Sequence, residues 1–122
     1  MPKDEVAMVR AYYRAYVEKD RPAIEALLAA NFRFTSPRDN RIDRALYFER
    51  CWPYGLDITS FDLDHIVLHG NRVFVTYDAR RENGTGFRGC EIHTIGDGRI
   101  DSVDVYFGWD LPHPAAEGGF LD

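Results

Sequence analysis

Cysteine, long apolar runs and an excess of positive charge are all scarce or absent in this sequence of 122 residues. No apolar run approaches the roughly 20 residues of a membrane span, so we expect no contact with a membrane. The first ten residues, MPKDEVAMVR, lack the apolar core of a secretory signal. These absences favour a cytoplasmic protein.

The two cysteines, Cys51 and Cys90, form no Cys-x-x-Cys motif and have no histidine nearby at zinc-ligand spacing. The sequence therefore predicts no metal site, and nothing in it indicates a bound cofactor. Reduced thiols are the expected state in a cytoplasm, and a disulfide between the two residues is the alternative.

Acidic residues outnumber basic ones, 20 to 15, which gives a net charge of −5. Without a basic field we expect no binding to nucleic acid. A chain that is 45% hydrophobic and 29% charged has the composition of a soluble protein, and its length suits one domain. The aromatic content of 14% is high, and such rings line cavities as readily as they fill cores.

Two helices are expected at the start of the chain. Apolar residues recur at helical spacing from about residue 4 to residue 19. Asp20 has the position of an N-cap for a second, shorter helix with Pro22 in its first turn. We expect Asn31 to end that helix in a left-handed conformation.

A strand and a third helix follow. The segment FRFTSP, residues 32–37, predicts a strand that ends at its proline, and the next residues, RDN, predict a loop. The segment IDRALYFERCW, residues 42–52, predicts a third helix that buries Leu46, Tyr47 and Trp52.

The second half of the chain has the alternation of strands. Residues 60–80 form two runs joined at His-Gly-Asn, and residues 90–108, CEIHTIGDGRIDSVDVYFG, form a second hairpin around Gly-Asp-Gly. Residues 111–122 are expected to be an irregular tail. The predicted fold class is α+β in one domain, residues 1–122: a cone-shaped, curved antiparallel sheet with three N-terminal helices packed on its concave face.

Glu91 and His93 lie two residues apart in one of these strands, so both side chains point to the same face of the sheet. A carboxyl and an imidazole on one face indicate either that the face is solvated or that the two groups line a pocket. The cone would place a hollow at its wide end.

The segments AYYRAYVEKDRPAIEALLAANFRFTSP and CEIHTIGDGRIDSVDVYFG resemble the nuclear transport factor 2-like superfamily, in its SnoaL-like branch. The resemblance covers about residues 4–109. It implies a cone-shaped α+β barrel that is usually homodimeric through its convex sheet. The superfamily includes ketosteroid isomerases, polyketide cyclases, epoxide hydrolases, dehydratases and non-catalytic binders, so the fold does not decide the function.

Comparison with ketosteroid isomerases assigns three positions. Their first-helix tyrosine falls on Tyr12, their late-strand acid on Glu91, and their base on Ser36, which cannot take a proton unaided at neutral pH. The resemblance thus implies that this chain keeps two hydrogen-bond donors for a substrate oxygen and lacks the base. A Glu91 surrounded by apolar side chains would stay uncharged and donate a hydrogen bond. The alternative is an ion pair with Arg80 or Arg88.

His93 is the expected replacement for the missing base, paired with Glu91 or Asp78, because its titration range suits proton transfer. The alternative is a half-buried histidine bonded to a main-chain carbonyl. Asp78 and Arg80 also resemble part of an epoxide-hydrolase set, although no second aspartate stands in the matching place and a solvated sheet face is the other interpretation.

The remaining candidates are residues expected to line the hollow. They are Tyr16, Phe34, Ser36, Tyr47, Trp52, Asp78, Val105, Phe107 and Trp109. The aromatic members have an alternative role as core. Cys90 is expected on the opposite, convex face, where the outward Tyr106 suggests a homodimer interface.

Three functions are consistent with the sequence. The first is a cofactor-free isomerase, cyclase or dehydratase in which Glu91 and His93 transfer protons and Tyr12 orients an apolar, oxygen-bearing small molecule. The second is a non-catalytic binding domain that uses the same hollow, and the third is a dimeric interaction module that uses its sheet.

Overall fold

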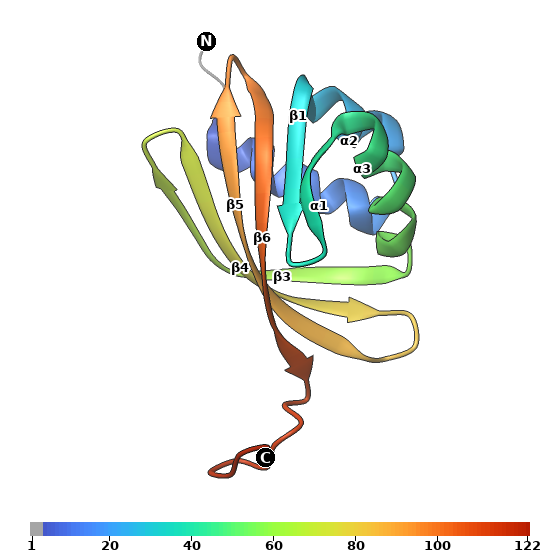
Figure 1. Ribbon diagram of the computed structural model, residues 1–122, viewed down its shortest axis with the longest axis vertical. Helices are drawn as coiled ribbons and strands as arrows, with labels where there is room; N and C mark the ends of the chain where they lie inside the picture. The colour runs from blue at the N-terminus through green and yellow to red at the C-terminus, as the bar shows by residue number, and fades with distance from the viewer. Residues whose placement is uncertain (1–3) are drawn as a thin grey trace.

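The computed structural model describes residues 4–122, which form three α-helices, one short 3₁₀ turn and six strands (Figure 1). In chain order these are α1 (Glu5–Glu18), α2 (Arg21–Leu27), β1 (Leu28–Ser36), β2 (Asp39–Asp43), α3 (Arg44–Arg50), η1 (Pro53–Gly55), β3 (Ile58–His69), β4 (Arg72–Arg81), β5 (Gly86–Gly96) and β6 (Arg99–Leu111).

Each α-helix begins at an aspartate. The carboxylates of Asp4, Asp20 and Asp43 accept hydrogen bonds from main-chain N–H groups in the first turns of α1, α2 and α3. These bonds satisfy donors that have no partner inside the helix. The first predicted helix and the N-cap role of Asp20 are therefore confirmed.

The prediction for Asn31 is wrong. The helix α2 ends at Leu27, and the chain passes directly into β1 with Leu28 already extended, so Asn31 lies inside the strand. Phe32 and Phe34, both buried, alternate along β1, and a shift in its pairing with β6 lies between Leu28 and Arg33.

Two further boundaries differ from the prediction. The RDN segment is only in part a loop: Arg38 lies in the tight turn after β1, and Asp39 and Asn40 begin β2, antiparallel to β1. The helix α3 starts at Arg44, after the Asp43 cap. Its packed face carries Tyr47 and Phe48, so Leu46 is 37% exposed and its predicted burial is wrong. Tyr47 and Trp52 are buried as predicted.

The six strands form one sheet in the order β2-β1-β6-β5-β4-β3. Both predicted hairpins are present, and Gly70 and Gly98 adopt the positive φ angles that such tight turns require. The sheet is mixed rather than antiparallel throughout, because β6 returns beside β1 in the same direction. It has two free edges, β2 and β3, and therefore does not close into a barrel.

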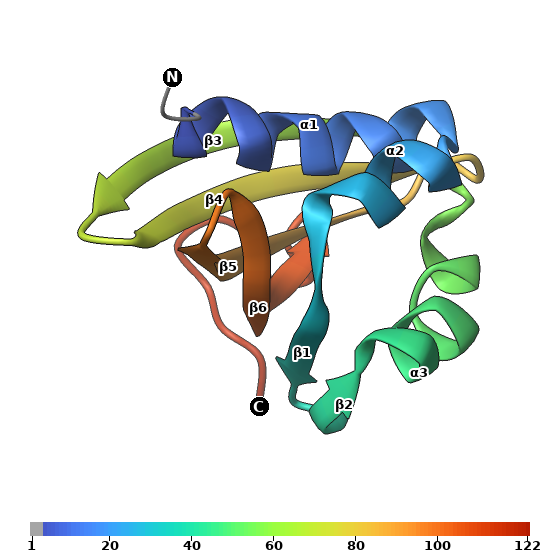
Figure 2. The ribbon, with the colours of Figure 1, turned by 90° about the horizontal axis from the view of Figure 1, so that it is seen from above.

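The sheet curves around the helices, which lie on its concave side (Figure 2). The helix α1 packs on β3 and β4, and α3 packs on β1 and β2. Bulges interrupt the pairing of β3 with β4 and of β5 with β6, and such irregularities bend a sheet. The α+β cone with helices on the concave face is confirmed, apart from the parallel pair.

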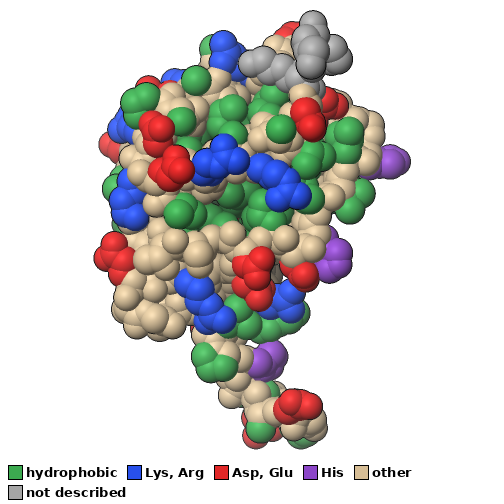
Figure 3. Space-filling model, turned by 180° about the vertical axis from the view of Figure 1, so that it is seen from behind, with side chains coloured by type: hydrophobic (Ala, Val, Ile, Leu, Met, Phe, Trp, Pro, Cys, Tyr) green, Lys and Arg blue, Asp and Glu red, His purple; other side chains and the backbone are tan. Residues whose placement is uncertain are grey.

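The chain after β6 has no helix or strand and projects from the body (Figures 1 and 3). Near its end, Phe120 is 83% exposed. The expected start of the domain at residue 1 lies outside the described residues. Within residues 4–122, no helix is long and apolar enough to cross a membrane.

Replacing Asp43 tests the capping of α3. Asp43→Ala removes the acceptor for a main-chain N–H of the first turn, and we expect a loss of about 1 kcal/mol in the free energy of unfolding. Asp43→Asn keeps an acceptor oxygen and should retain most of the stability. Urea denaturation measures both, and equal losses in the two variants would contradict a capping role.

Candidate functional site

A cavity of about 460 Å³ lies between α1, the end of α3 and the concave face of the sheet. Its volume is within the range of small-molecule pockets. Its wall is mostly aromatic, with charged side chains at Arg38, Asp39, Arg50, Arg81 and Glu91. The other lining residues are Tyr12, Tyr13, Tyr16, Phe34, Ser36, Cys51, Tyr54, Gly55, Ile58, Phe61, Tyr77, Phe87, Val105 and Phe107.

Glu91, on β5, is the acidic group in the interior of this cavity and is 8% exposed. Its Oε1 accepts a hydrogen bond from the Tyr13 hydroxyl and its Oε2 accepts one from the Tyr77 hydroxyl, both at 2.8 Å. A carboxyl whose two oxygens both accept has the hydrogen-bonding pattern of a carboxylate. The sequence leaves two roles open for Glu91, an uncharged donor or one half of an ion pair with Arg80 or Arg88, and within residues 4–122 neither arginine forms an ion pair with it.

His93 lies directly behind this arrangement and is fully buried. Its Nε2 is 2.9 Å from the Tyr13 hydroxyl and 3.6 Å from Glu91 Oε1, and its Nδ1 has no partner within residues 4–122. A buried N–H without an acceptor costs more than a bare lone pair, so the tautomer with the proton on Nε2 is favoured. His93 then donates to Tyr13, and Tyr13 donates to Glu91.

A second group of buried phenols lies beside the first. The Tyr47 hydroxyl is hydrogen-bonded to the Tyr12 hydroxyl at 2.6 Å and also to the Tyr16 hydroxyl. Tyr12 and Tyr16 line the cavity, whereas Tyr47 supports them from the core. A ligand oxygen in the cavity would therefore meet phenols that are held in place by hydrogen bonds from behind.

Burial keeps these phenols neutral. It is the main cause that raises the pKa of Tyr12, Tyr16 and Tyr47 above the ordinary value. Burial also raises the pKa of Tyr13 and Tyr77, and the charge of the neighbouring Glu91 adds to the effect. All five hydroxyls thus keep their protons. Those of Tyr13 and Tyr77 are given to Glu91. Because the Tyr47 hydroxyl has one proton for its two bonds, at least one of Tyr12 and Tyr16 donates to Tyr47 and the other is left to donate to a ligand.

Two glycines leave room for this arrangement. A Cβ atom on Gly89 would lie 2.6 Å from the Tyr77 hydroxyl, so the missing side chain lets that phenol cross β5 to reach Glu91. Gly55 leaves similar space for the ring of Tyr16. The close approach of rings to the backbone at these positions excludes larger residues.

Polar groups gather at the mouth of the cavity. Asp39 accepts hydrogen bonds from Ser36 at 2.9 Å and from Arg50 at 3.2 Å. The thiol of Cys51 lines the same region, and burial, followed by the charge of Asp39, raises its pKa to about 12. Cys51 and Cys90 are both free thiols.

The structure brings seven of the predicted site residues into the cavity wall. They are Tyr12, Tyr16, Phe34, Ser36, Glu91, Val105 and Phe107. The five others, His93, Tyr47, Trp52, Asp78 and Trp109, lie outside the wall. His93 and Tyr47 act through their hydrogen bonds to lining phenols, and Trp52 packs in the core against the ring of Tyr16.

The placement of Asp78 in the hollow requires correction. The residues of β4 that face the core are Val73, Val75, Tyr77 and Ala79, so Asp78 points to the other face. There it forms an ion pair with Arg88 at 2.8 Å. Trp109 also lies outside, in a neighbouring groove where the Arg88 guanidinium stands over its ring.

Sequence analysis missed Tyr13 and Tyr77, the two partners of Glu91. The sequence prediction considers Asp78 and Arg80 in the segment VTYDAR. Tyr77 alternates with them and points to the opposite face of β4, with the buried apolar residues. This alternation, Val-x-Val-x-Tyr, was visible in the sequence. The resemblance places the first-helix tyrosine at Tyr12, whereas the phenol that reaches Glu91 from α1 is that of Tyr13, about 100° further around the helix.

No group of three potential metal ligands comes together within residues 4–122.

Alkaline conditions test the burial of the phenols. Because their pKa values are raised in the folded state, their contribution to stability is fully present below about pH 10, where the unfolded phenols begin to ionise. Stability should then fall as the pH rises, by roughly 1.4 kcal/mol per pH unit for each phenol that stays neutral.

Urea midpoints measured between about pH 8 and pH 11 give this slope. Tyr47→Phe should reduce the slope, whereas Tyr54→Phe, at a residue that is 79% exposed, should leave it unchanged. A free energy of unfolding that does not fall over this interval would contradict the proposed burial.

The comparisons with known proteins agree with the architecture. A family model described as the SnoaL-like domain matches residues 9–103. No curated protein matches the chain significantly.

Solved structures of several bacterial proteins share the fold. An NTF2-like protein of unknown function from Cytophaga hutchinsonii is 23% identical, with a TM-score of 0.71 over 88% of this chain and 93% of that one. A proposed polyketide cyclase from Pseudomonas putida is 20% identical, with a TM-score of 0.69 over 88% and 93%. An LEH-like epoxide hydrolase of M. tuberculosis is 19% identical, with a TM-score of 0.67 over 85% and 82%.

At these identities the structures show a shared fold and no more. The family model, however, covers most of the residues from the first helix to the last strand of the sheet. The chain therefore belongs to the SnoaL-like domain family, within the NTF2-like fold.

Proposed function

We propose that this protein is a cofactor-independent enzyme that moves a proton on an apolar, oxygen-bearing small molecule, as an isomerase, cyclase or dehydratase does. The observation that carries the proposal is Glu91, a carboxylate that lines an aromatic cavity and has no lysine or arginine partner within residues 4–122. A carboxylate in such a cavity can act as a general base.

Each group has a role in this proposal. Glu91 removes a proton from a carbon next to a carbonyl, and the electron pair of the broken C–H bond moves to the carbonyl oxygen to give an enolate. The hydroxyl of Tyr12 or Tyr16 donates a hydrogen bond to that oxygen. On a β,γ-unsaturated ketone this enolate is a conjugated dienolate. Glu91 then returns the proton to its γ-carbon, the carbonyl re-forms and the C=C bond shifts to the α,β position, so that the reaction is a net isomerisation.

Tyr13 and Tyr77 position Glu91. Their two hydrogen bonds fix the plane of the carboxylate, and His93 fixes Tyr13 in turn. The roles of base and helper are thus exchanged relative to the sequence prediction. His93 is fully buried behind Tyr13 and acts through it, whereas Glu91 faces the cavity.

The second candidate is a non-catalytic binding protein. One observation favours it: both oxygens of Glu91 already accept hydrogen bonds from phenols, and such bonds stabilise the carboxylate and weaken it as a base. In that case the phenols and the aromatic wall would hold a ligand without turning it over.

The comparisons support a small-molecule function at the level of the family. The structures that share the fold include a proposed polyketide cyclase and an epoxide hydrolase. Neither name identifies the substrate of this chain. A cytoplasmic location stays a prediction from the sequence.

Hydrogen–deuterium exchange at an acidic carbon distinguishes an enzyme from a binder. We expect the protein to accelerate exchange of the α-protons of 2-tetralone in D₂O, followed by NMR. Glu91→Gln should lower this rate by roughly a hundredfold or more, since general bases contribute at least that much. An amide can still pair with both phenols, so the fold should be retained.

Glu82→Gln, at an exposed turn residue, is the matched control and should exchange at the wild-type rate. Binding of 2-naphthol, an enolate-like phenol, is measured on the same proteins. Wild-type protein that binds 2-naphthol but accelerates no exchange would favour the binding protein over the enzyme.

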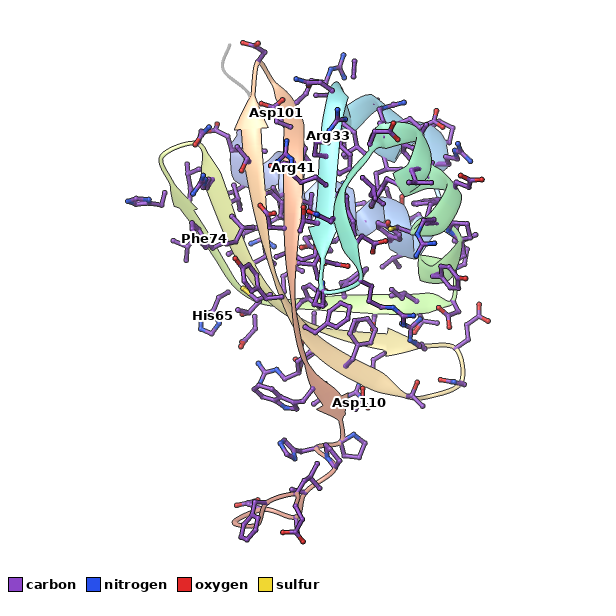
Figure 4. All side chains as sticks on the ribbon, in the orientation of Figure 1. Arg33, Arg41, His65, Phe74, Asp101 and Asp110 are labelled. Carbon is purple, nitrogen blue, oxygen red and sulfur yellow. The ribbon has the colours of Figure 1, made fainter. Side chains whose placement is uncertain are left out.

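We also propose that the protein is a homodimer through the outer face of the sheet. Phe74, Ile92, Cys90 and Tyr106 lie in adjacent cross-strand rows on that face, and Tyr106 is 58% exposed. Figure 4 shows Phe74 on the outer side of β4, away from the helices. Each row also contains a polar residue, Asp104 beside Ile92 and Thr76 beside Cys90, so the proposal depends mainly on the exposed ring of Tyr106.

Sedimentation equilibrium tests the dimer. We expect twice the monomer mass of 14.1 kDa, and we expect Tyr106→Lys to shift the protein toward monomer because it places a charge in the interface. Wild-type protein that sediments as a monomer at all concentrations would contradict the proposed interface.

A further inference from the structure

We infer that the ligand of the cavity carries a carboxylate at one end of its apolar body, and that Arg38 at the mouth of the cavity binds this carboxylate. The inference rests on the proposed function only in requiring that the cavity binds a small molecule. It adds the chemical class of that molecule, an apolar carboxylic acid, and a residue that selects it.

The charges in the cavity wall are unevenly distributed. Arginines contribute three of the five charged lining residues, at Arg38, Arg50 and Arg81, although the chain as a whole has a net charge of −5. All three come from segments at the mouth: the turn between β1 and β2, the end of α3 and the end of β4. The interior contributes the carboxylate of Glu91.

Two of these arginines already have acidic partners. Arg50 forms an ion pair with Asp39 at 3.2 Å, and Arg81 forms one with Asp57 at 2.6 Å. The guanidinium of Arg81 also stands 4.8 Å from the ring centroid of Phe87, which fixes it as part of the wall. These two side chains are held in place by the protein itself.

Arg38 has no such partner. Only its main-chain N–H is bonded, to the Ser36 hydroxyl, and its guanidinium forms no hydrogen bond or ion pair with any of residues 4–122. The neighbouring Asp39 accepts bonds from Ser36 and Arg50 and forms none with Arg38. The cavity therefore has one guanidinium at its mouth whose donors are free for a ligand.

The charges at the interior and at the mouth of the cavity determine the orientation of a bound carboxylic acid. The carboxylate of Glu91 repels an anion from the interior, while the guanidinium of Arg38 attracts it to the mouth. A guanidinium binds a carboxylate through two parallel hydrogen bonds, which a neutral polar group cannot match. The apolar body and its reactive oxygen would then occupy the aromatic interior beside Tyr12 and Tyr16.

Arg38 is thus expected to determine specificity rather than to take part in proton transfer. A neutral molecule with the same ring system should bind through the aromatic wall alone. The contribution of Arg38 should also weaken at high salt, because the residue is exposed to solvent.

The experiment compares 6-hydroxy-2-naphthoate with 2-naphthol, which have the same rings and hydroxyl and differ by the carboxylate. Calorimetry is carried out on wild type, on Arg38→Gln and on Arg41→Gln. Arg41 is an exposed arginine of β2 outside the cavity wall and serves as the matched control (Figure 4). Both sites are exposed, so the fold should be unaffected.

We expect wild-type protein to bind the naphthoate about fivefold to tenfold more tightly than 2-naphthol, a typical gain for a charge-assisted bond near solvent. Arg38→Gln should abolish this preference while leaving the affinity for 2-naphthol unchanged, and Arg41→Gln should preserve it. High salt should reduce the preference in wild type.

A wild-type protein that binds both probes equally, or an Arg38→Gln variant that keeps the preference, would overturn the inference and leave the proposed function intact. Failure of wild type to bind either probe would overturn both. Loss of 2-naphthol binding in Arg38→Gln would show that Arg38 supports the cavity structurally, which also overturns the assignment.

Discussion

The hydrogen bonds from Tyr13 and Tyr77 to Glu91 are the interaction on which the rest of this site depends. A carboxylate with little solvent exposure is costly unless its oxygens are hydrogen-bonded, and these two phenols supply the bonds from α1 and β4. They also join α1 to the sheet in the interior of the cavity. Stability and candidate chemistry therefore rest on the same three side chains.

The fold explains how Glu91 can be hydrogen-bonded by the protein and still line the cavity. The concave face of the sheet, α1 and the end of α3 enclose the cavity that Glu91 lines. The same curvature requires small residues where rings approach the backbone, and Gly89 is the clearest example, since it opens the path of Tyr77 to Glu91. A few glycines thus allow the backbone and the rings of the site to pack closely.

Much of the fold could be predicted from the sequence, because its signals are local. Aspartate caps, apolar periodicity and Gly-containing turns act within a few residues, and they located α1, the start of α2 and both hairpins. The parallel pairing of β1 with β6 could not be predicted in this way, because it joins segments about 70 residues apart. The strand β2 could not be predicted because its first residues, Asp39 and Asn40, follow Pro37 and are typical of turns.

The site was predicted less well, for a physical reason. Alternation placed Glu91 and His93 on one face correctly, but it could not show that Tyr13 stands between the imidazole and the cavity. Which of two adjacent tyrosines on a helix reaches a strand depends on how the helix is rotated on the sheet. That rotation is determined by packing, for example of Tyr13 on Phe61 and Tyr77, and no short sequence pattern encodes it.

A crystal structure of the complex with 2-naphthol is the most direct measurement of the central claim, that Glu91 is a phenol-held carboxylate open to a ligand. The account predicts the naphthol in the cavity, with its oxygen within hydrogen-bond distance of Tyr12, Tyr16 or Glu91 and the bonds from Tyr13 and Tyr77 intact. A naphthol bound elsewhere, or a Glu91 sealed behind closed aromatic rings, would contradict it.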